Sequence, residues 1–198
     1  MRRDLRIIAD LISPSARVLD LGCGEGDLLA WLKHNKSVNG YGLDVDPNNI
    51  TTCLAKGVNV IEHDLDAGLH DFADDGFDLV VMTETLQSVR HPDRLLSEML
   101  RIGKECIVTF PNFAHWRCRL YLGFRGRMPV VQQLPNEWFD TPNIRLCTFD
   151  DFEQLCRQRG YRIIERFVVG PDYRSHALAD SLPNLFGTIA FYRIGRSE

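Results

Sequence analysis

The stretch VLDLGCGEG, residues 18–26, places three glycines at alternate positions directly after a short apolar run. Such a run is typical of a buried strand, and residues 27–34, with Leu28, Leu29 and Leu32, have the spacing of a helix. A glycine-rich turn between a strand and the N-terminus of a helix presents backbone amides to a ligand. The stretch therefore predicts a binding loop at the end of a strand.

The rest of the chain repeats the alternation of strand and helix. Strands are expected at residues 17–21, 41–45, 58–61, 77–82, 105–110, 161–169 and 188–194. Helices are expected near the N-terminus, at 27–34, from Asp46-Pro47 to Gly57, from Pro92 onward and from Thr148 to Gly160, with another around 113–122. This alternation predicts an α/β fold with a mostly parallel sheet and helices on both faces.

The length of 198 residues and the absence of repeats and linkers predict one domain, residues 1–198. Residues 111–147 are rich in aromatic residues, Arg, Pro and Asn and show weak periodicity. A long irregular segment in a compact domain is usually a binding loop or lid. We therefore expect residues 111–147 to contact a substrate or a partner.

The composition narrows the classes of partner. A formal net charge of -4 without a basic stripe argues against a nucleic-acid partner. Six cysteines without C-x-x-C spacing predict free thiols, no metal site and a reducing, cytoplasmic location. The sequence has no signal peptide, and no window has the roughly 18 to 20 uninterrupted apolar residues that cross a bilayer, so no membrane span is expected.

The glycine motif does not fit the common phosphate-binding loops. Counted from Gly22, the third glycine of G-x-G-x-x-G is replaced by Asp27, and no Gly-Lys-Ser/Thr follows. Asp44 ends the second predicted strand 18 residues after Gly26, where an acidic residue accepts hydrogen bonds from ribose hydroxyls. The carboxylate of Asp20 suits an ammonium group. A ribose and an amino acid together indicate S-adenosylmethionine as cofactor.

With these residues in place, the sequence resembles the class I methyltransferases and, within them, the methionine biosynthesis protein W (MetW) family. The narrower resemblance is carried by five stretches: VLDLGCGEGDLL at 18–29, GYGLDVD at 40–46, DGFDLVVMTETLQ at 75–87, TFPNFAHWRCRLYLGFRGRMP at 109–129 and EWFDTPNIRLCTFDDF at 137–152. The resemblance implies a Rossmann-like fold, with a seven-stranded, mostly parallel sheet whose last strand is antiparallel.

The resemblance also implies roles for individual residues. The methionine part of the cofactor would contact Asp20, Gly22, Cys23, Gly24 and Gly26. The ribose would lie at Asp44 and Val45, the adenine at Asp64 and Leu65, and the sulfonium beside Thr83 and Glu84. S-adenosylhomocysteine would be the product.

The nature of the activity stays open at this stage. His115 and Glu84 are the candidate catalytic groups, although a histidine between aromatic residues is more often packed or hydrogen-bonded. The Arg and aromatic residues of 116–127 suit a solvated helix face, a clamp for an anionic substrate or a protein-docking surface. The resemblance implies methionine biosynthesis with the homoserine O-acyltransferase MetX as partner. The protein would be either a small-molecule methyltransferase or a non-catalytic, cofactor-sensing subunit of the acyltransferase.

Overall fold

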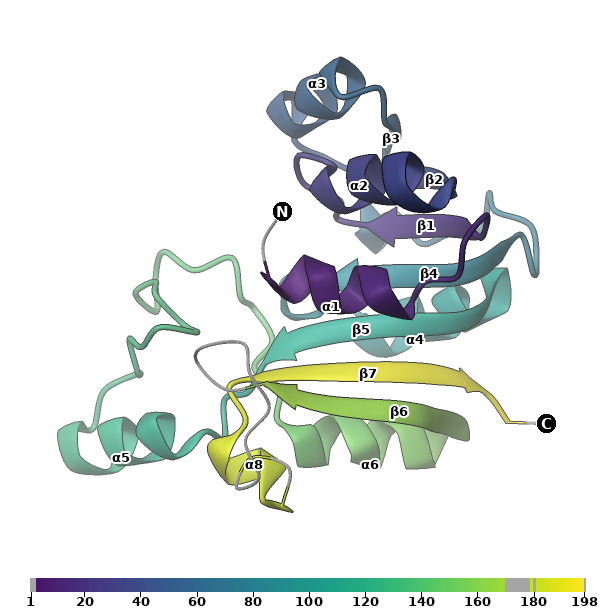
Figure 1. Ribbon diagram of the computed structural model, residues 1–198. Coiled ribbons are helices and arrows are strands. Elements are labelled where there is room, and N and C mark those ends of the chain that lie inside the picture. The colour runs from purple at the N-terminus through teal and green to yellow at the C-terminus, as the bar shows by residue number, and fades with distance from the viewer. Residues whose placement is uncertain (1–2, 170–178, 180, 198) are drawn as a thin grey trace.

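A computed structural model describes residues 3–169, 179 and 181–197. Seven strands form one sheet in the order β3-β2-β1-β4-β5-β7-β6 (Figure 1). They are β1 Arg17–Leu21, β2 Asn39–Asp44, β3 Asn59–Glu62, β4 Phe77–Thr83, β5 Gly103–Pro111, β6 Tyr161–Val169 and β7 Ile189–Arg196. The first five strands pair in parallel, and β7 pairs antiparallel with both β5 and β6. The expected Rossmann-like methyltransferase fold is confirmed.

Helices cover both faces of the sheet. They are α1 Arg3–Leu11, α2 Asp27–Lys36, α3 Pro47–Ala55, α4 Pro92–Ile102, α5 Trp116–Arg125, α6 Phe149–Arg159 and α8 Pro183–Phe186. Helices α1 and α2 lie in front of the sheet in Figure 1, whereas α4 and α6 lie behind it. Helix α5 projects from the body of the molecule. Two short 3₁₀ turns, η1 Leu65–Ala67 and η2 Leu86–Ser88, follow β3 and β4.

Two apolar cores flank the sheet, because alternate strand residues face opposite helices. The core behind the sheet contains an aromatic cluster of Phe110, Phe149, Phe152 and Tyr192. The rings of Phe152 and Tyr192 lie 4.6 Å apart, and the buried Tyr192 hydroxyl donates to Glu153 at 3.0 Å. This cluster joins α6 to the antiparallel end of the sheet.

The helices and strands expected from the sequence are found, with boundaries shifted by one to three residues at several ends. The second strand ends at Asp44, so Val45 lies outside it and is exposed. The helix expected around 113–122 begins only at Trp116, because Phe113 donates its amide to the Cys147 carbonyl and His115 caps the helix. The turns η1 and η2 were not expected from the sequence. Each is only three residues long, which is too short to show a periodic pattern.

Strand β2 can lie close to the glycine loop because it lacks a side chain at residue 42. A Cβ atom added to Gly42 would lie 2.4 Å from the Cys23 sulfur and 2.9 Å from the Cys23 Cβ. The glycine therefore sets the distance between β2 and the loop that follows β1.

We predict that Gly42→Ala lowers the free energy of unfolding by about 1–3 kcal/mol, because the methyl group overpacks the contact with Cys23. Denaturant unfolding measures the loss. Gly123→Ala is the matched control: its added Cβ meets no atom within 4 Å, and alanine in a helix is favoured by about 0.5–1 kcal/mol. Equal stability of the two variants would contradict the prediction.

Candidate functional site

The carboxyl ends of β1, β2 and β4 surround a cavity of about 800 Å³. Neighbouring ends of parallel strands are the usual ligand position in open α/β sheets. The loop after β1 forms part of the cavity wall. It is held against the end of β2, because the amides of Gly22 and Cys23 both donate to the Leu43 carbonyl. The lining residues are Leu5, Asp20, Gly22, Cys23, Gly24, Glu25, Asp27, Leu28, Asp44, Asn49, Thr83, Glu84, Thr85, Ser88 and Pro142.

The three alternate glycines of the loop all have left-handed backbones, with φ of +71°, +54° and +73° at Gly22, Gly24 and Gly26. A Cβ on Gly22 would lie 2.5 Å from the Thr85 hydroxyl, and one on Gly26 would lie 2.7 Å from the Cys53 sulfur. No atom lies within 4 Å of a Cβ on Gly24. Gly22 and Gly24 line the cavity, whereas Gly26 packs against α3 and is absent from the described lining residues.

The carboxylate of Asp44 holds the loop in place. One oxygen accepts from the Gly24 amide at 2.8 Å, and the other accepts from the Asp46 amide at 2.9 Å and the Asn49 side chain at 3.2 Å. Asp44 is buried and borders the cavity. A carboxylate has about four acceptor positions, so the geometry leaves capacity for a ligand.

Asp20 brings a second carboxyl group to the same end of the sheet. Burial, followed by the charge of Asp44, raises the pKa of Asp20 from 3.8 to about 7. Its Oδ1 atom is buried without a hydrogen-bond partner. An unpaired buried carboxyl oxygen is costly, and a cationic ligand group would relieve that cost.

A smaller cavity of about 160 Å³ continues from Asp44 along the ends of β2 and β3. Val45, expected at the ribose, and Asp64 and Leu65, expected at the adenine, all line it. The Asp64 side chain also accepts from the Asp66 amide and caps η1. The remaining lining residues are Gly22, Leu43, Asp44, His63, Asp66, Thr85, Ser88 and Val89.

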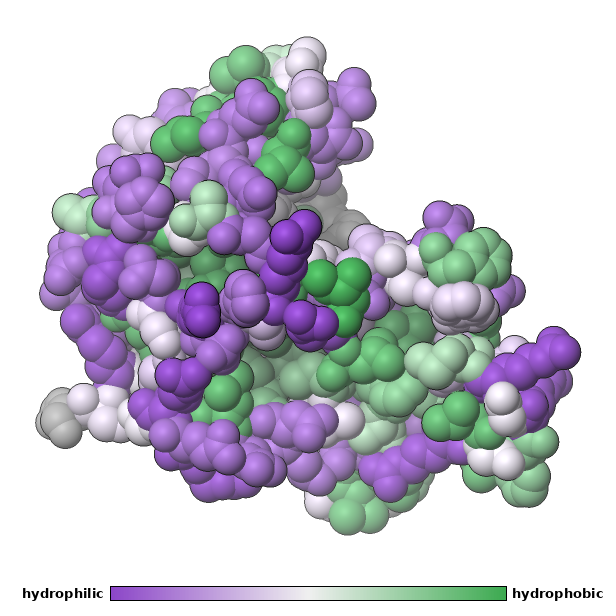
Figure 2. Space-filling view, turned by 180° about the vertical axis from the view of Figure 1, so that it is seen from behind, coloured by the Kyte–Doolittle hydropathy of each residue, from purple (hydrophilic) through white to green (hydrophobic). Residues whose placement is uncertain are grey.

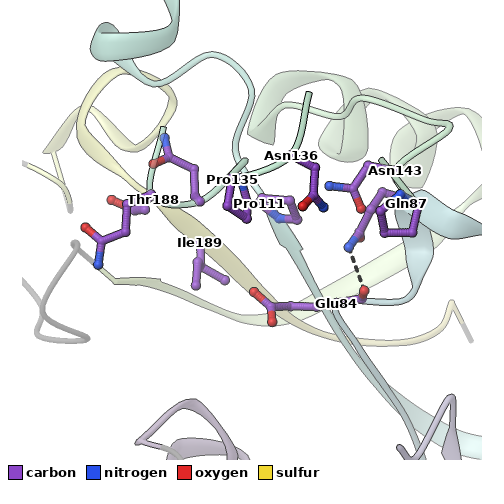
Figure 3. Close-up of a pocket in the computed structure, with 11 residues that line it drawn as sticks. Glu84, Gln87, Pro111, Pro135, Asn136, Asn143, Thr188 and Ile189 are labelled. Atoms are coloured by element: carbon purple, nitrogen blue, oxygen red, sulfur yellow. Dashed lines mark hydrogen bonds between the residues drawn. The ribbon is translucent and has the colours of Figure 1, made fainter. Parts of the chain in front are cut away.

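Glu84 stands where the large cavity meets a third cavity, of about 300 Å³ (Figure 3), and Thr83 lines the large one. Glu84 and Pro142 line both. Glu84 has a left-handed backbone with φ of +50°, and its amide donates to the Thr109 carbonyl and hydroxyl. A non-glycine residue in this conformation carries strain that often accompanies a functional position. Thr83 ends β4, and its buried hydroxyl oxygen has no hydrogen-bond partner.

His115 has a structural position that its sequence context did not reveal. It is the N-cap of α5, and its Nδ1 atom accepts from the Arg117 amide at 3.4 Å. Burial and the nearby charge of Arg117 lower the pKa of the imidazole. His115 is absent from the described residues lining the three cavities. Its assignment as a catalytic base stays a prediction.

The arginines of 116–127 lie on and beside α5, away from these cavities. Arg117 stacks over Trp116 at 5.4 Å, and Arg125 stacks over Tyr121 at 4.9 Å. None of the four arginines is among the described lining residues of the cavities. This position does not favour a clamp for an anionic substrate, so the solvated face and the docking surface remain.

Several lining residues had no clear signal in the sequence. Asn49 lies on α3, Thr85 and Ser88 lie in or before a short turn, and Pro142 comes from the irregular segment. Among the described residues, no group of three or more metal-ligating side chains is found, and no helix is long and apolar enough to cross a membrane. All six cysteines are free thiols.

The chain matches known proteins along most of its length. The family model described as "Methionine biosynthesis protein MetW" matches residues 2–194. The "Bifunctional methionine biosynthesis protein MetXA/MetW" of Rhodopirellula baltica is 36% identical over 98% of this chain and 33% of its own length. "Methyltransferase GfsG" of Streptomyces halstedii is 29% identical over 46% of this chain and 35% of its own length. The chain thus spans about a third of the length of these relatives.

Solved structures with low sequence identity share the fold. An S-adenosylmethionine-dependent methyltransferase from Archaeoglobus fulgidus has a TM-score of 0.70 at 18% identity, over 98% of this chain and 91% of its own. Haemonchus contortus phosphoethanolamine N-methyltransferase 2, in complex with phosphomonomethylethanolamine and S-adenosylhomocysteine, has a TM-score of 0.72 at 15% identity, over 99% and 52%. Together with the family match over nearly the whole chain, these findings show that the chain belongs to the MetW family of methionine biosynthesis proteins.

Proposed function

We propose that the large cavity and its smaller continuation bind S-adenosylmethionine. The observation that carries this proposal is the pair of buried carboxyl groups, Asp20 and Asp44, at opposite sides of a glycine loop. Asp44 offers acceptors to ribose hydroxyls, and the unpartnered Oδ1 of Asp20 suits the ammonium group of the methionine part. The residues present therefore fit this cofactor.

In this arrangement the adenine lies in the smaller cavity, where Leu65 packs on the ring and Asp64 accepts from the exocyclic amine. The ribose lies at Asp44 beside Val45, and the methionine part follows the loop of Gly22, Cys23, Gly24 and Gly26. Thr83 and Glu84 flank the sulfur. The cofactor would supply an electrophilic methyl group on a positively charged sulfur atom.

We propose further that the protein is a small-molecule methyltransferase of methionine biosynthesis that acts in the cytoplasm. The contact of two cavities at Glu84 supports this reading, because one can hold the cofactor and the other a methyl acceptor. The alternative, a non-catalytic subunit that senses S-adenosylmethionine, needs the same cofactor site and different affinities in two states.

The partner in either case is the homoserine O-acyltransferase MetX. The relative from Rhodopirellula baltica, by its printed name, joins MetXA and MetW in one chain. A tether of this kind keeps two proteins at high effective concentration and suits proteins that work in contact.

The surface that fits this partner is the projecting face of α5 and the segment after it. Hydrophobic and hydrophilic side chains are mixed on that side of the molecule, at the right in Figure 2. Phe124 is 84% exposed and Trp138 is 71% exposed, and Leu120, Met128 and Phe139 in the same part of the chain are exposed too. Single exposed apolar residues are normal on a surface, whereas several in one segment indicate an interaction site. Among the described residues of α5, Cys118 is the one that is buried, so most of this helix is open to a partner.

The charge of this docking surface indicates the chemistry of the matching surface. Helix α5 carries Arg117, Arg119 and Arg125 and no acidic residue, in a chain whose net charge is -4. Aromatic residues and arginines are enriched at the energetic centres of protein interfaces. The complementary face of MetX would thus be apolar with acidic residues around it.

We predict that Asp44→Asn weakens binding of S-adenosylhomocysteine by about 10- to 100-fold, because charged acceptors for the ribose are lost. Calorimetric titration measures the affinity. Asp46→Asn is the matched control, since Asp46 caps α3 and asparagine caps helices equally well. Equal affinities of wild type and Asp44→Asn would refute the ribose assignment.

We predict that the affinity for S-adenosylmethionine rises between pH 6 and pH 7.5 through ionisation of Asp20. With a pKa of about 7, the ionised fraction increases from about one tenth to about three quarters, and only the carboxylate attracts the ammonium group. The wild-type affinity, divided by that of the Asp20→Asn variant at the same pH, should therefore rise by up to about eightfold between pH 6 and pH 7.5. Parallel pH profiles of the two proteins would exclude Asp20 from the ammonium site.

The same raised pKa gives a check that needs no ligand. Between pH of about 4 and about 7, the folded protein keeps a proton on Asp20 that the unfolded chain has released. Its contribution to the free energy of unfolding therefore falls as pH rises through this range, by at most about 1.4 kcal/mol per pH unit. Asp20→Asn should remove that contribution in denaturant unfolding.

We predict that Phe124→Ser combined with Trp138→Ser raises the dissociation constant for MetX by at least about 30-fold, the effect of losing one interface residue worth about 2 kcal/mol. Light scattering on mixtures of the purified proteins follows the complex. Leu54→Ser, which removes a 61% exposed leucine from α3, should leave binding unchanged. Loss of the complex in both variants, or in neither, would place the interface elsewhere.

The Asp44→Asn variant also separates the roles that the cofactor could play. If MetX requires methyl transfer or cofactor sensing, Asp44→Asn forms the complex without supporting acyltransferase activity. Full activity with a variant shown not to bind S-adenosylhomocysteine would remove both roles and leave a structural one.

A further inference from the structure

The cavity of about 300 Å³ beside Glu84 is lined mainly by residues that have no assigned contact with the cofactor. Glu84 itself is the exception. It is formed by the ends of β4 and β5, the turn η2, the start of β7 and residues 132–143 (Figure 3). The described lining residues are Glu84, Gln87, Pro111, Gln132, Gln133, Pro135, Asn136, Pro142, Asn143, Thr188 and Ile189. Its contact with the larger cavity through Glu84 and Pro142 is where a second small molecule would meet the cofactor.

Gln87 presents an oxygen atom that needs a hydrogen-bond donor. Its amide nitrogen donates to the Glu84 carbonyl, at 2.5 Å, which is the dashed line in Figure 3. A carbonyl accepts only from the NH₂ end of an amide, so the other end must be oxygen. That oxygen is buried without a hydrogen-bond partner in a residue only 6% exposed. A buried unpartnered acceptor in a cavity wall indicates a ligand atom that donates.

Thr188 repeats this feature on the opposite wall. It precedes β7, is 4% exposed, and its hydroxyl oxygen has no hydrogen-bond partner. Its carbonyl accepts from the Asn112 amide at 2.9 Å, which fixes the backbone at this point. The Gln87 oxygen, an acceptor, and the Thr188 hydroxyl, which can accept or donate, thus lack partners in two residues that line the same cavity.

The charge of the walls narrows the ligand further. Glu84 is the acidic side chain among the described lining residues, which include no Lys, Arg or His. Carboxylates and phosphates are usually held by Arg, Lys or a group of backbone amides. Acceptor oxygens beside a carboxylate instead match N–H groups, and a protonated amine adds a favourable charge.

We infer that this cavity binds a small molecule through a primary or secondary amine, with a hydroxyl group on the same molecule reaching Thr188. The amine would donate to Gln87 Oε1 and to the Glu84 carboxylate. This inference rests on the proposed function, in which the ligand of this cavity is the methyl acceptor, and it assigns that acceptor to the amino alcohols and related amines.

Three probes of equal size test the assignment: ethanolamine, ethylene glycol and glycolate. Each carries a hydroxyl group on a two-carbon frame, and the second group is an ammonium, a neutral hydroxyl or a carboxylate. Titrations followed by amide NMR signals of the protein saturated with S-adenosylhomocysteine should show ethanolamine binding about tenfold more tightly than either other probe, since charge-assisted hydrogen bonds are about twice as strong as neutral ones. Ligands this small bind with dissociation constants of about 1–10 mM.

Variants connect the binding to the two walls. Thr188→Val should weaken ethanolamine about three- to tenfold, whereas Thr188→Ser keeps the hydroxyl and the affinity. Glu84→Gln should abolish the preference for ethanolamine over ethylene glycol. Glu137→Gln is the matched control, because Glu137 is exposed in the same segment and is not among the described lining residues. Thermal unfolding of each variant verifies that it is folded.

The outcomes separate this inference from the proposed function. Glycolate binding as tightly as ethanolamine, no response to ethanolamine, or an unchanged affinity in Thr188→Val overturns the amine site. If S-adenosylhomocysteine fails to bind to the wild-type protein while ethanolamine still binds in its absence, the cofactor proposal fails and the amine site stands.

Discussion

The hydrogen bond from the Gly24 amide to the Asp44 carboxylate, 2.8 Å long, connects the glycine loop to the end of the neighbouring strand. The same carboxylate accepts from the first residues of the following helical segment, at the Asp46 amide and the Asn49 side chain. One side chain therefore positions the loop after β1 and the turn after β2 relative to each other. Asp44 thereby fixes the Gly24 amide, while the Leu43 carbonyl holds the amides of Gly22 and Cys23.

This arrangement has an electrostatic cost that the ligand can offset. Asp44 stands near the buried Asp20, and both burial and the charge of Asp44 raise the pKa of Asp20 to about 7. The charge of Asp44 on the neighbouring strand disfavours ionisation of Asp20, so an added positive charge would be stabilised at that point. In the proposed function, the polar residues that shape the loop would also favour a cationic ligand.

The sequence predicted the structure best at positions where only one structural role suits the residue type. Alternate glycines after an apolar run and an acidic residue ending the next strand predicted both the fold and the surroundings of the cavity. The family resemblance added the antiparallel direction of the seventh strand, since the pattern of residues 188–194 predicted a strand without its direction. The contact of Thr85 with Gly22 joins segments far apart in sequence, and the hydrogen bond from Asn49 to Asp44 depends on how α3 starts after β2, so neither has a periodic pattern. Gly26 is the opposite case. Its position in the motif suggested contact with a ligand, whereas its close packing against Cys53 explains why a glycine is needed there.

The segment from 111 to 147 links the two halves of the proposed function. It is held at both ends near the mouth of the site: the Asn112 side chain donates to the Gly187 carbonyl at 2.8 Å, and Phe113 donates its amide to Cys147.

A third contact ties the segment to the turn after β4, where the Arg145 amide donates to the Gln87 carbonyl at 2.9 Å. Between these anchors the chain forms α5, with its exposed aromatic and basic surface, and then the wall of the cavity beside Glu84. A protein bound to α5 and a ligand in the cavity would thus contact the same tethered segment. Any difference in affinity that one causes for the other must be reciprocal. Methyl transfer and control of a partner are therefore compatible in this fold, because both would act through one segment.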